Sequence, residues 1–390
     1  MTDRRALRVL LVDPSLFTAP YDAALTGGLI EAGVSPIWVT RPTRAGDRQE
    51  LPIELTDPFF YKRVDEATWL PARLKPLAKG AAHLAGLVAL LRKIRANPPD
   101  VVHFQWTVVP PLDALAMALI RRWCPLVLTV HDTVPFNGER LSLLQNLGFD
   151  LPMRLAHRVI VHTDSGRQTL IARGIPPGKI ATIPHGALQL QVPLPQRTER
   201  PDGRYSFVLF GEIKPYKGVD VLIEAVHRLP DEIRRQTRVV IAGRPRMNLA
   251  PLEERIASLG LADTIELRPQ RQSEEAMAAL FVEADSFVFP YRQIDASGVW
   301  FLTQSLGRWM IASRVGIFAA DLVEGRQGVL VPPGDSAALA AAMEQAVRQR
   351  LTGDAMPASD QWIGIGHATR NVYDALLPQH SGAALVEARS

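Results

Sequence analysis

The sequence has a single cysteine and no long apolar run, and each shortage excludes a class of protein. Cys124 alone can form neither an intramolecular disulfide nor a thiolate metal cluster, which predicts a protein of the reducing cytosol. The longest apolar stretch in the first half, Leu84–Leu91, falls far short of the roughly 20 residues that a membrane-spanning helix needs. The first apolar run soon meets Asp13 and Pro14, which is not the pattern of a signal peptide.

Long runs of one charge and metal-binding motifs are also missing. The formal net charge of +4 is modest, and no aromatic-interleaved basic stripe or zinc-finger spacing points to nucleic acid. No Asp-x-Asp pair and no cluster of histidines and carboxylates predicts a metal, and no G-x-G-x-x-G follows the first apolar run. The expected partner is therefore an acidic small molecule or an anionic membrane surface, with neither a metal nor another cofactor.

The sequence does contain two successive series of short apolar, β-branched runs, separated by helical patterns. At 390 residues the chain is long enough for two domains. Runs that are apolar on both faces are typical of parallel strands covered by helices, and the alternation predicts an α/β protein. We expect two doubly wound parallel sheets that face one another across a cleft. The predicted strands are residues 8–13, 34–40, 101–106, 127–132, 158–163, 180–185, 206–211, 239–243, 264–268, 286–290, 310–313 and 328–331.

A proline-rich segment without periodicity, residues 187–204, separates the two series. It places the first domain at residues 1–195 and the second at residues 196–358. The remaining residues, 359–390, contain a helical pattern, and a terminal helix in such a two-domain fold can cross back onto the first domain. Predicted helices in the first half are residues 21–32, 81–95 and 112–123.

The most informative segment, residues 207–226, reads FVLFGEIKPYKGVDVLIEAV. A buried strand ends at Gly211, Lys214 and Lys217 lie in the following loop, and a helix begins after Gly218. Two lysines beside a helix N-terminus can hold a diphosphate, because their ammonium charges add to the free helical N–H groups. The alternative is that both are ordinary surface lysines of a loop between a strand and a helix.

This segment resembles the phosphate-binding loop of family-4 retaining glycosyltransferases. Members of that family carry a basic residue, usually arginine, and then a Lys-Gly pair after the first strand of the C-terminal domain. Lys214 takes the place of the basic residue, and Lys217 and Gly218 match the pair. Glu212 stands where many members have arginine. The resemblance implies a GT-B fold of two Rossmann-like domains and sugar transfer with retention.

A second segment, residues 287–307, reads FVFPYRQIDASGVWFLTQSLG and is similar to another segment of the family. Ser297 and Gly298 open a helix there, which a plain N-cap serine would also explain. In the family one acid precedes this helix under the donor sugar, and a second acid holds the ribose. Asp295 takes the first position and Thr303 the second, so the second acid is missing. The chain therefore resembles a divergent branch of the family.

The first domain carries candidate residues at the ends of its predicted strands. In LVLTVHDTVPFNG, residues 126–138, the resemblance puts His131 beside the donor sugar and the acceptor. The alternative is a buried neutral histidine bonded to a backbone carbonyl. Asp132, His103 on the neighbouring strand and Tyr21 in the first loop are predicted to bind the acceptor. His185 is interpreted as a residue of the domain junction.

The resemblance implies that the second domain binds a nucleotide-diphosphate sugar and the first a glycan or lipid-linked glycan acceptor. The leaving phosphate is then the expected base, without a metal. Two other functions stay open: a catalytically silent subunit of the same fold, because the second acid is missing, and a sugar-nucleotide epimerase. The predicted catalytic residues are His131 and Asp295, and the predicted donor-binding residues are Gly211, Lys214, Lys217, Gly218, Pro269, Arg271, Ser297 and Gly298.

A basic, amphipathic segment between Lys62 and Arg95 predicts a contact with anionic lipid, which would suit a lipid-linked acceptor. It would make the protein cytoplasmic with a peripheral position on the inner face of the membrane. The alternative is an apolar stripe that faces the domain core, with solvated cations around it. The stripe consists of Leu84, Leu87, Val88 and Leu91, with Trp69 nearby, and the cations are Arg63, Arg73, Lys75, Lys79, Arg92, Lys93 and Arg95.

Overall fold

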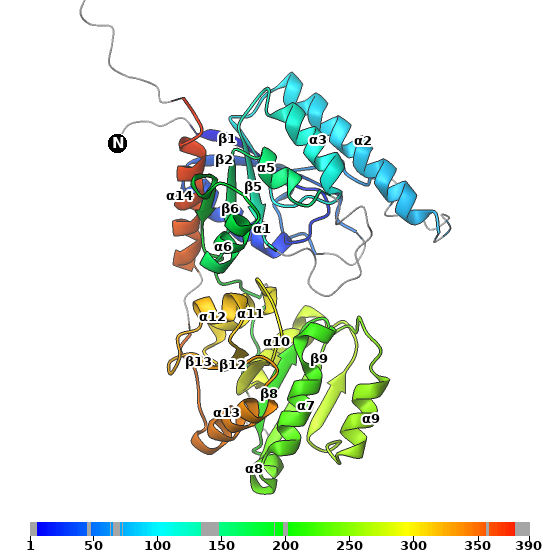
Figure 1. The fold of residues 1–390 in the computed structure, drawn as a ribbon, viewed down its shortest axis with the longest axis vertical. Coiled ribbons are helices and arrows are strands. Elements are labelled where there is room, and N and C mark those ends of the chain that lie inside the picture. Colours follow the sequence, from blue (N-terminus) through cyan, green and yellow to red (C-terminus); the bar gives the residue numbers. More distant parts are fainter. Residues whose placement is uncertain are drawn as a thin grey trace, which may run out of the picture.

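The computed structural model has two domains, each built on one parallel sheet with helices on its faces (Figure 1). It describes residues 6–44, 48–62, 64, 71, 73–133, 148–190, 192–197, 202–355 and 359–378. The predicted architecture of two doubly wound Rossmann-like domains is confirmed. No helix in this described part of the chain has the length and apolar content needed to cross a bilayer.

The first sheet has the strand order β3-β2-β1-β4-β5-β6-β7. Its interior strand β1 is buried from Val9 onward, because helices cover both of its faces. Strand order reverses between β1 and β4, and this switch point is where ligands bind in such sheets. The strands are β1 Leu7–Asp13, β2 Val34–Thr40, β3 Thr56–Pro58, β4 Val101–Phe104, β5 Leu126–Val130, β6 Arg158–Val161 and β7 Ile180–Thr182.

The second sheet has the strand order β10-β9-β8-β11-β12-β13, and its switch point lies between β8 and β11. The carboxyl end of β8 leads into the lysine loop, and the carboxyl end of β11 leads into the loop that carries Asp295. Two segments that are far apart in the sequence therefore meet at one edge. The strands are β8 Tyr205–Phe210, β9 Thr237–Ala242, β10 Ile265–Arg268, β11 Ser286–Phe289, β12 Trp309–Ser313 and β13 Gly328–Val331.

Helices cover both faces of each sheet (Figure 1). The helices that follow strands of the first domain are α1 Ala19–Glu31, α2 Lys75–Ala96, α3 Pro110–Ile120, α5 Leu151–Leu155 and α6 Asp164–Ala172. Those of the second domain are α7 Val219–Arg228, α8 Asp231–Arg235, α9 Ala250–Ser258, α10 Glu274–Glu283, α11 Gly298–Thr303, α12 Gly316–Asp321 and α13 Ser336–Gln349. The last helix is α14, Ser359–Asp374.

Helix α14 follows the second domain in the sequence but packs against α1 of the first (Figure 1). The two helices approach closely at glycines: a Cβ atom on Gly28 would lie 2.0 Å from the carbonyl oxygen of Trp362. A Cβ atom on Gly366 would lie 2.0 Å from the carbonyl oxygen of Gly28. Arg370 donates to the carbonyl oxygens at the end of α1, those of Ala32 (2.8 Å) and Gly33 (2.6 Å). A cation at a helix C-terminus stabilises that helix, so Arg370 stabilises α1 and ties α14 to it.

Two elements differ from the sequence prediction for identifiable reasons. Strand β3 was not predicted, because it is a three-residue edge strand that includes Pro58 and is only half-buried. Helix α2 begins at Lys75 and not at residue 81, because its first two turns lack the apolar periodicity on which the prediction rested. Several predicted strands also end one to three residues early, where the chain leaves the sheet and the candidate site residues begin.

Candidate functional site

The lysine loop after β8 is shaped by two glycines with positive φ. Gly211 has φ +104° and Gly218 has φ +68°, conformations that other residues rarely adopt. A Cβ atom on Gly218 would lie only 1.9 Å from the carbonyl oxygen of Pro290, so the loop can close against β11 only with glycine there. A short 3-10 helix, Pro215–Lys217, precedes Gly218, and α7 begins directly after it.

Lys217 is a buried ammonium with little compensation. Its side chain is 6% exposed, and among the described residues its Nζ donates one long hydrogen bond, to the carbonyl oxygen of Phe210 at 3.4 Å. Nζ also lies 5.2 Å from the ring centre of Tyr291. Burial, and then the charge of Lys214, lower the pKa of Lys217 to about 7. An anion bound beside Lys217 would supply the missing partner.

Lys214 differs from Lys217 because it already contacts an acid. Its Nζ lies 3.3 Å from Oε2 of Glu212, and the same carboxylate forms an ion pair with Arg246 at 2.6 Å. The sequence interpretation assigned Glu212 no partner and missed Arg246, which follows β9. A diphosphate at Lys214 would compete with Glu212 for the ammonium. We therefore expect Lys214 to contribute less than Lys217.

The helix predicted at Ser297 and Gly298 is confirmed as α11. The Oγ atom of Ser297 accepts a hydrogen bond from the backbone N–H of Trp300 (3.4 Å), as an N-cap residue does. A Cβ atom on Gly298 would meet no other atom within 4 Å, so the backbone there is open to a ligand. Thr303, at the position of the missing second acid, is buried and donates to the carbonyl oxygen of Trp300 (2.9 Å). It faces its own helix and not a ribose.

Pro269 and Arg271, predicted to lie against the nucleobase, are exposed in the loop between β10 and α10. This loop follows the carboxyl end of its strand, as the lysine loop does. Both residues therefore lie on the edge of the sheet where the donor is expected, and their role stays a prediction.

The corresponding edge of the first sheet contains a small cavity of about 40 Å³. His131 and Asp132 line it, as do Gln105 and Trp106 from the end of β4. The ring of Trp106 stacks on His131, with centres 5.0 Å apart and planes 12° apart. Gln105 and Trp106 were not among the predicted residues, although the strand-end rule that selected His103 also applies to them.

Two predicted acceptor residues, Tyr21 and His103, are packed in the interior and line neither this cavity nor the open edge. Tyr21 is 4% exposed and packs edge-on against His131, with ring centres 4.9 Å apart. His103 is 1% exposed and is hydrogen-bonded to Tyr373 (2.7 Å) and Thr129 (2.8 Å). Ring packing and α14 cover both side chains, and their contact with an acceptor stays a prediction.

Asp132 and Asp295 face each other across the two domains. Burial, and then the charge of Asp295, raise the pKa of Asp132 to about 7, and Lys214 partly opposes this shift. The carboxylate of Asp295 accepts hydrogen bonds from the backbone N–H of Thr133 (2.6 Å) and from its hydroxyl (2.8 Å). The structure thus brings together His131, Asp132, Asp295 and Lys214, which come from three strand ends.

Three further contacts join the domains near this site. The ring of His185 stacks on Phe301 of α11 with centres 3.5 Å apart, which confirms His185 as a residue of the domain junction. The backbone N–H of Leu188 donates to the carbonyl oxygen of Phe301 (2.9 Å). Arg48 forms an ion pair with Glu274 at the start of α10. Both sheet edges are therefore held close enough to share one ligand.

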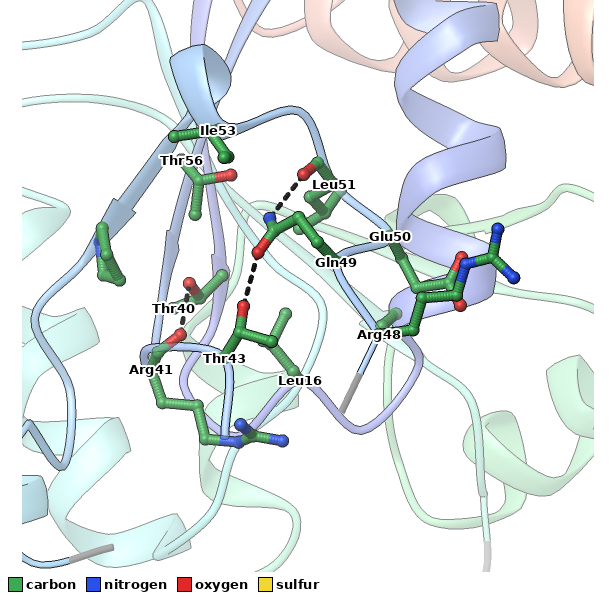
Figure 2. A pocket seen from close by; sticks show the side chains of 12 residues that line it. Leu16, Thr40, Arg41, Thr43, Arg48, Gln49, Glu50, Leu51, Ile53 and Thr56 are labelled. Carbon is green, nitrogen blue, oxygen red and sulfur yellow. Dashed lines mark hydrogen bonds between the residues drawn. The ribbon is translucent and has the colours of Figure 1, made fainter. Parts of the chain in front are cut away.

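A second cavity, of about 90 Å³, lies beside the end of β2 (Figure 2). Its wall is closed by hydrogen bonds within one loop: Thr43 donates to Gln49 (2.5 Å), and Gln49 donates to the carbonyl oxygen of Leu51 (2.6 Å). The guanidinium of Arg41 bonds to the carbonyl oxygens of Ser15 and Pro42, both at 2.9 Å. These polar groups satisfy one another, so we assign the cavity no ligand.

Comparison with known proteins identifies the class that this fold and site define. The family described as Glycosyltransferase Family 4 matches residues 23–187, and the family described as Glycosyl transferases group 1 matches residues 204–349. The two matches cover most of each domain, the first from α1 onward and the second from the start of β8. The chain belongs to these glycosyltransferase families and has the GT-B fold.

The chain is also similar to individual proteins, in sequence or in fold. The chain is 27% identical over 321 residues to a D-inositol 3-phosphate glycosyltransferase of Streptosporangium roseum, a match that covers 76% of this chain and 71% of the relative. Among solved structures, Anabaena Alr3699/HepE in complex with UDP and glucose has a TM-score of 0.64 at 16% identity, over 95% of each chain. A UDP-N-acetylglucosamine 2-epimerase has a TM-score of 0.56 at 13% identity, over 98% of this chain and 100% of the other. Such structural likeness shows the fold alone.

Proposed function

We propose that this glycosyltransferase moves a sugar from a nucleotide-diphosphate sugar onto a hydroxyl group of a glycan or lipid-linked glycan, with retention and without a metal. The observation that carries the proposal is the buried Lys217 at the switch point of the second sheet, whose ammonium forms no ion pair with an acid in the part of the chain that the structure describes. A diphosphate is an anion of the right charge for that position. Asp132 and His131, at the carboxyl edge of the first sheet, lie across from this lysine loop.

The proposed reaction needs little covalent help from the protein. The bond between the anomeric carbon and the diphosphate oxygen breaks, and the acceptor oxygen forms a new bond on the same face of the sugar. The acceptor proton passes to the departing phosphate oxygen. Lys217 and the open backbone at Gly298 stabilise the negative charge that develops on the leaving group. Among the described residues, no group of three His, Cys, Asp or Glu side chains could hold a metal ion, and metal independence stays part of the proposal.

Binding and product analysis test the proposed function. We expect UDP-glucose, which one of the Anabaena HepE structures contains, or another nucleotide sugar to raise the melting temperature. A ligand at 100 times its Kd stabilises a protein by about 2.7 kcal/mol. With a panel of polyol and glycan acceptors, which includes the D-inositol 3-phosphate named in the relatives, the product should gain the mass of the sugar.

Other outcomes would support the rival functions. An epimerase would convert the donor into an isomer of equal mass without an acceptor. A silent subunit would bind a nucleotide sugar or glycan but release no nucleotide diphosphate. Absence of binding by any nucleotide sugar at millimolar concentration would contradict the proposal.

We also propose that α2 contacts an anionic membrane surface, because its outer face exposes apolar side chains and one of them, Leu77, lies between Lys75 and Lys79. The exposed apolar side chains are Leu77 (73%), Leu84 (47%) and Val88 (38%), while Leu87 is buried against the domain. The stripe predicted from the sequence was therefore partly wrong: Leu87 faces inward, and Leu77 belongs to the outer face. In Figure 1 the amino end of α2 extends beyond the other helices of its domain. Trp69 and Arg63 lie outside the described residues.

Flotation with liposomes at low salt tests the membrane contact. We expect more protein to float with anionic than with neutral liposomes, since each cation near such a surface contributes about 1 kcal/mol. The double variant Lys75→Glu/Lys79→Glu should lose this preference. Arg348→Glu, on α13 of the other domain, reverses an exposed charge elsewhere and should float like the wild type. Equal recovery with both liposomes would contradict the contact.

A further inference from the structure

A chain of buried polar side chains runs along the carboxyl edge of the first sheet. It joins the last helix, α14, to strands β4 to β7, and each neighbouring pair of groups is within hydrogen-bond distance or close to it. Each of its side chains is buried. In order they are Tyr373, His103, Gln105, His131 and His162, and the chain ends at the carbonyl oxygen of Ile183.

The Ile183 end of the chain determines which nitrogen of each ring carries a proton. Nδ1 of His162 lies 3.0 Å from the carbonyl oxygen of Ile183, and a carbonyl can only accept, so Nδ1 of His162 must be protonated. Burial lowers the pKa of His162 to about 4 and holds that of His131 well below its usual value, so both rings are neutral. The Nε2 atom of His162 is therefore an unprotonated acceptor.

The contact between His162 and His131 then determines which nitrogen of His131 carries the proton. Its Nδ1 lies 3.1 Å from Nε2 of His162, so Nδ1 of His131 must donate, and Nε2 of His131 is left with a lone pair. The structure places Oε1 of Gln105 at 3.2 Å from that Nε2, where two acceptors would face each other, so the amide must be turned by 180° to present its NH2 group. In the turned amide, the oxygen takes the position now held by the Gln105 nitrogen, 3.4 Å from Nε2 of His103. The oxygen and nitrogen of a side-chain amide have nearly the same shape, so the hydrogen-bond network decides which of them occupies which position.

The other end of the chain agrees with this direction. With Nε2 of His103 as a donor to Thr129 (2.8 Å) and Gln105, its Nδ1 must accept, and the hydroxyl of Tyr373 lies 2.7 Å away to donate. Every group then donates toward Ile183, and no two donors or two acceptors face each other. The reverse direction would place the unprotonated Nδ1 of His162 against a carbonyl oxygen.

We propose that His162 is a positioning residue that holds His131 as the Nδ1–H tautomer, so that Nε2 of His131 can only accept a hydrogen bond. His131 lines the cavity beside Asp132, where a sugar hydroxyl would replace the Gln105 amide as the donor to that Nε2. The hydrogen bond from a sugar hydroxyl to His131 rests on the proposed function, whereas the tautomer of His131 does not. Such an orienting partner fixes both the ring position and the atom that meets the substrate.

Nitrogen NMR of the ligand-free protein labelled with ring-15N histidine tests the tautomer directly. The His131 signals are assigned with the variant His131→Gln. We expect Nδ1 of His131 and of His162 to have pyrrole-type shifts, and Nε2 of both to have pyridine-type shifts. A pyrrole-type Nε2 on His131 would overturn the proposal whether or not the protein transfers sugar.

A variant tests whether His162 is responsible. His162→Phe keeps a ring but removes the acceptor, so we expect His131 to become a mixture of tautomers and kcat to fall about tenfold, the size expected for one hydrogen bond. His227→Phe, at an exposed position near the end of α7, should change neither. An unchanged His131 tautomer in His162→Phe would overturn the positioning role. If that variant does not fold, the wild-type spectrum still decides between the two tautomers.

Discussion

Lys217→Ala is expected to lower the rate of sugar transfer about 100-fold, which corresponds to about 3 kcal/mol for one preorganised charge in a water-poor site. The leaving diphosphate gains negative charge as the glycosidic bond breaks, so a charge already in place stabilises the transition state more than the ground state. Calorimetry should show weaker binding of the nucleoside diphosphate, with far less change for the nucleoside or monophosphate. Lys214→Ala should give a milder loss, because Glu212 already contacts that lysine.

Two variants separate the charge of Lys217 from its volume. Lys217→Met fills a similar space without the charge and should lose as much activity as Lys217→Ala. Because burial disfavours the ammonium in the folded chain, neither variant should lose thermal stability in proportion to its loss of activity. If Lys217→Ala bound the diphosphate like the wild type, the anion site would not lie in this loop.

The pH dependence of binding follows from the lowered pKa of Lys217. The ammonium is present below about pH 7 and is lost as pH rises through that value in the ligand-free protein. A phosphate group with a second pKa of about 6 is already ionised in that range, so it does not contribute to the change. Diphosphate affinity should therefore fall above pH 7, by up to about tenfold per pH unit.

Proton uptake gives an independent check of the same group. At pH 8, titrations in two buffers of different ionisation enthalpy should show that binding takes up a proton. In Lys217→Arg the guanidinium stays charged, so uptake and pH dependence should both largely disappear. Equal proton uptake in wild type and Lys217→Arg would assign the titration to another residue.

Asp295→Asn is expected to reduce turnover about 100-fold while binding of the free nucleoside diphosphate stays nearly unchanged. The reason is the place of Asp295 before Ser297 and opposite Asp132, where a donor sugar would lie between the two sheet edges. The variant keeps the shape of the side chain and removes its charge. Since the charge of Asp295 raises the pKa of Asp132, that pKa should fall in the variant, which NMR can follow.

Thr133→Val is the matched control for Asp295. It removes the hydroxyl that donates to Asp295 at 2.8 Å but keeps the backbone N–H contact at 2.6 Å. If Asp295 acts on the sugar, Thr133→Val should retain most of the turnover. If it only joins the domains, both variants should lose activity and stability together. Wild-type turnover in Asp295→Asn would show that the family alignment is wrong at this position.

The candidate site was predictable to the extent that it depends on strand ends. Lys214, Lys217, His131, Asp132 and Asp295 all follow apolar runs in the sequence, and residues at carboxyl ends of parallel strands share one edge. The same rule does not show that His103 is covered, because whether a strand-end side chain is open or covered depends on what packs over it. Here α14 supplies Tyr373, which is far away in the sequence and bonds to His103.

The sequence by itself determined the two-domain α/β architecture, because burial on both faces of each sheet requires apolar runs of a recognisable length and order. It also determined the lysine loop, whose glycines and basic residues are local. Only the tertiary structure decided which charges lose water, which acids face one another and which histidine bonds to which. The pKa of Lys217 near 7 and the pair of Asp132 and Asp295 arise from burial and distance between remote segments. Neither the pKa of Lys217 nor the pairing of the two acids follows from a local pattern of residues.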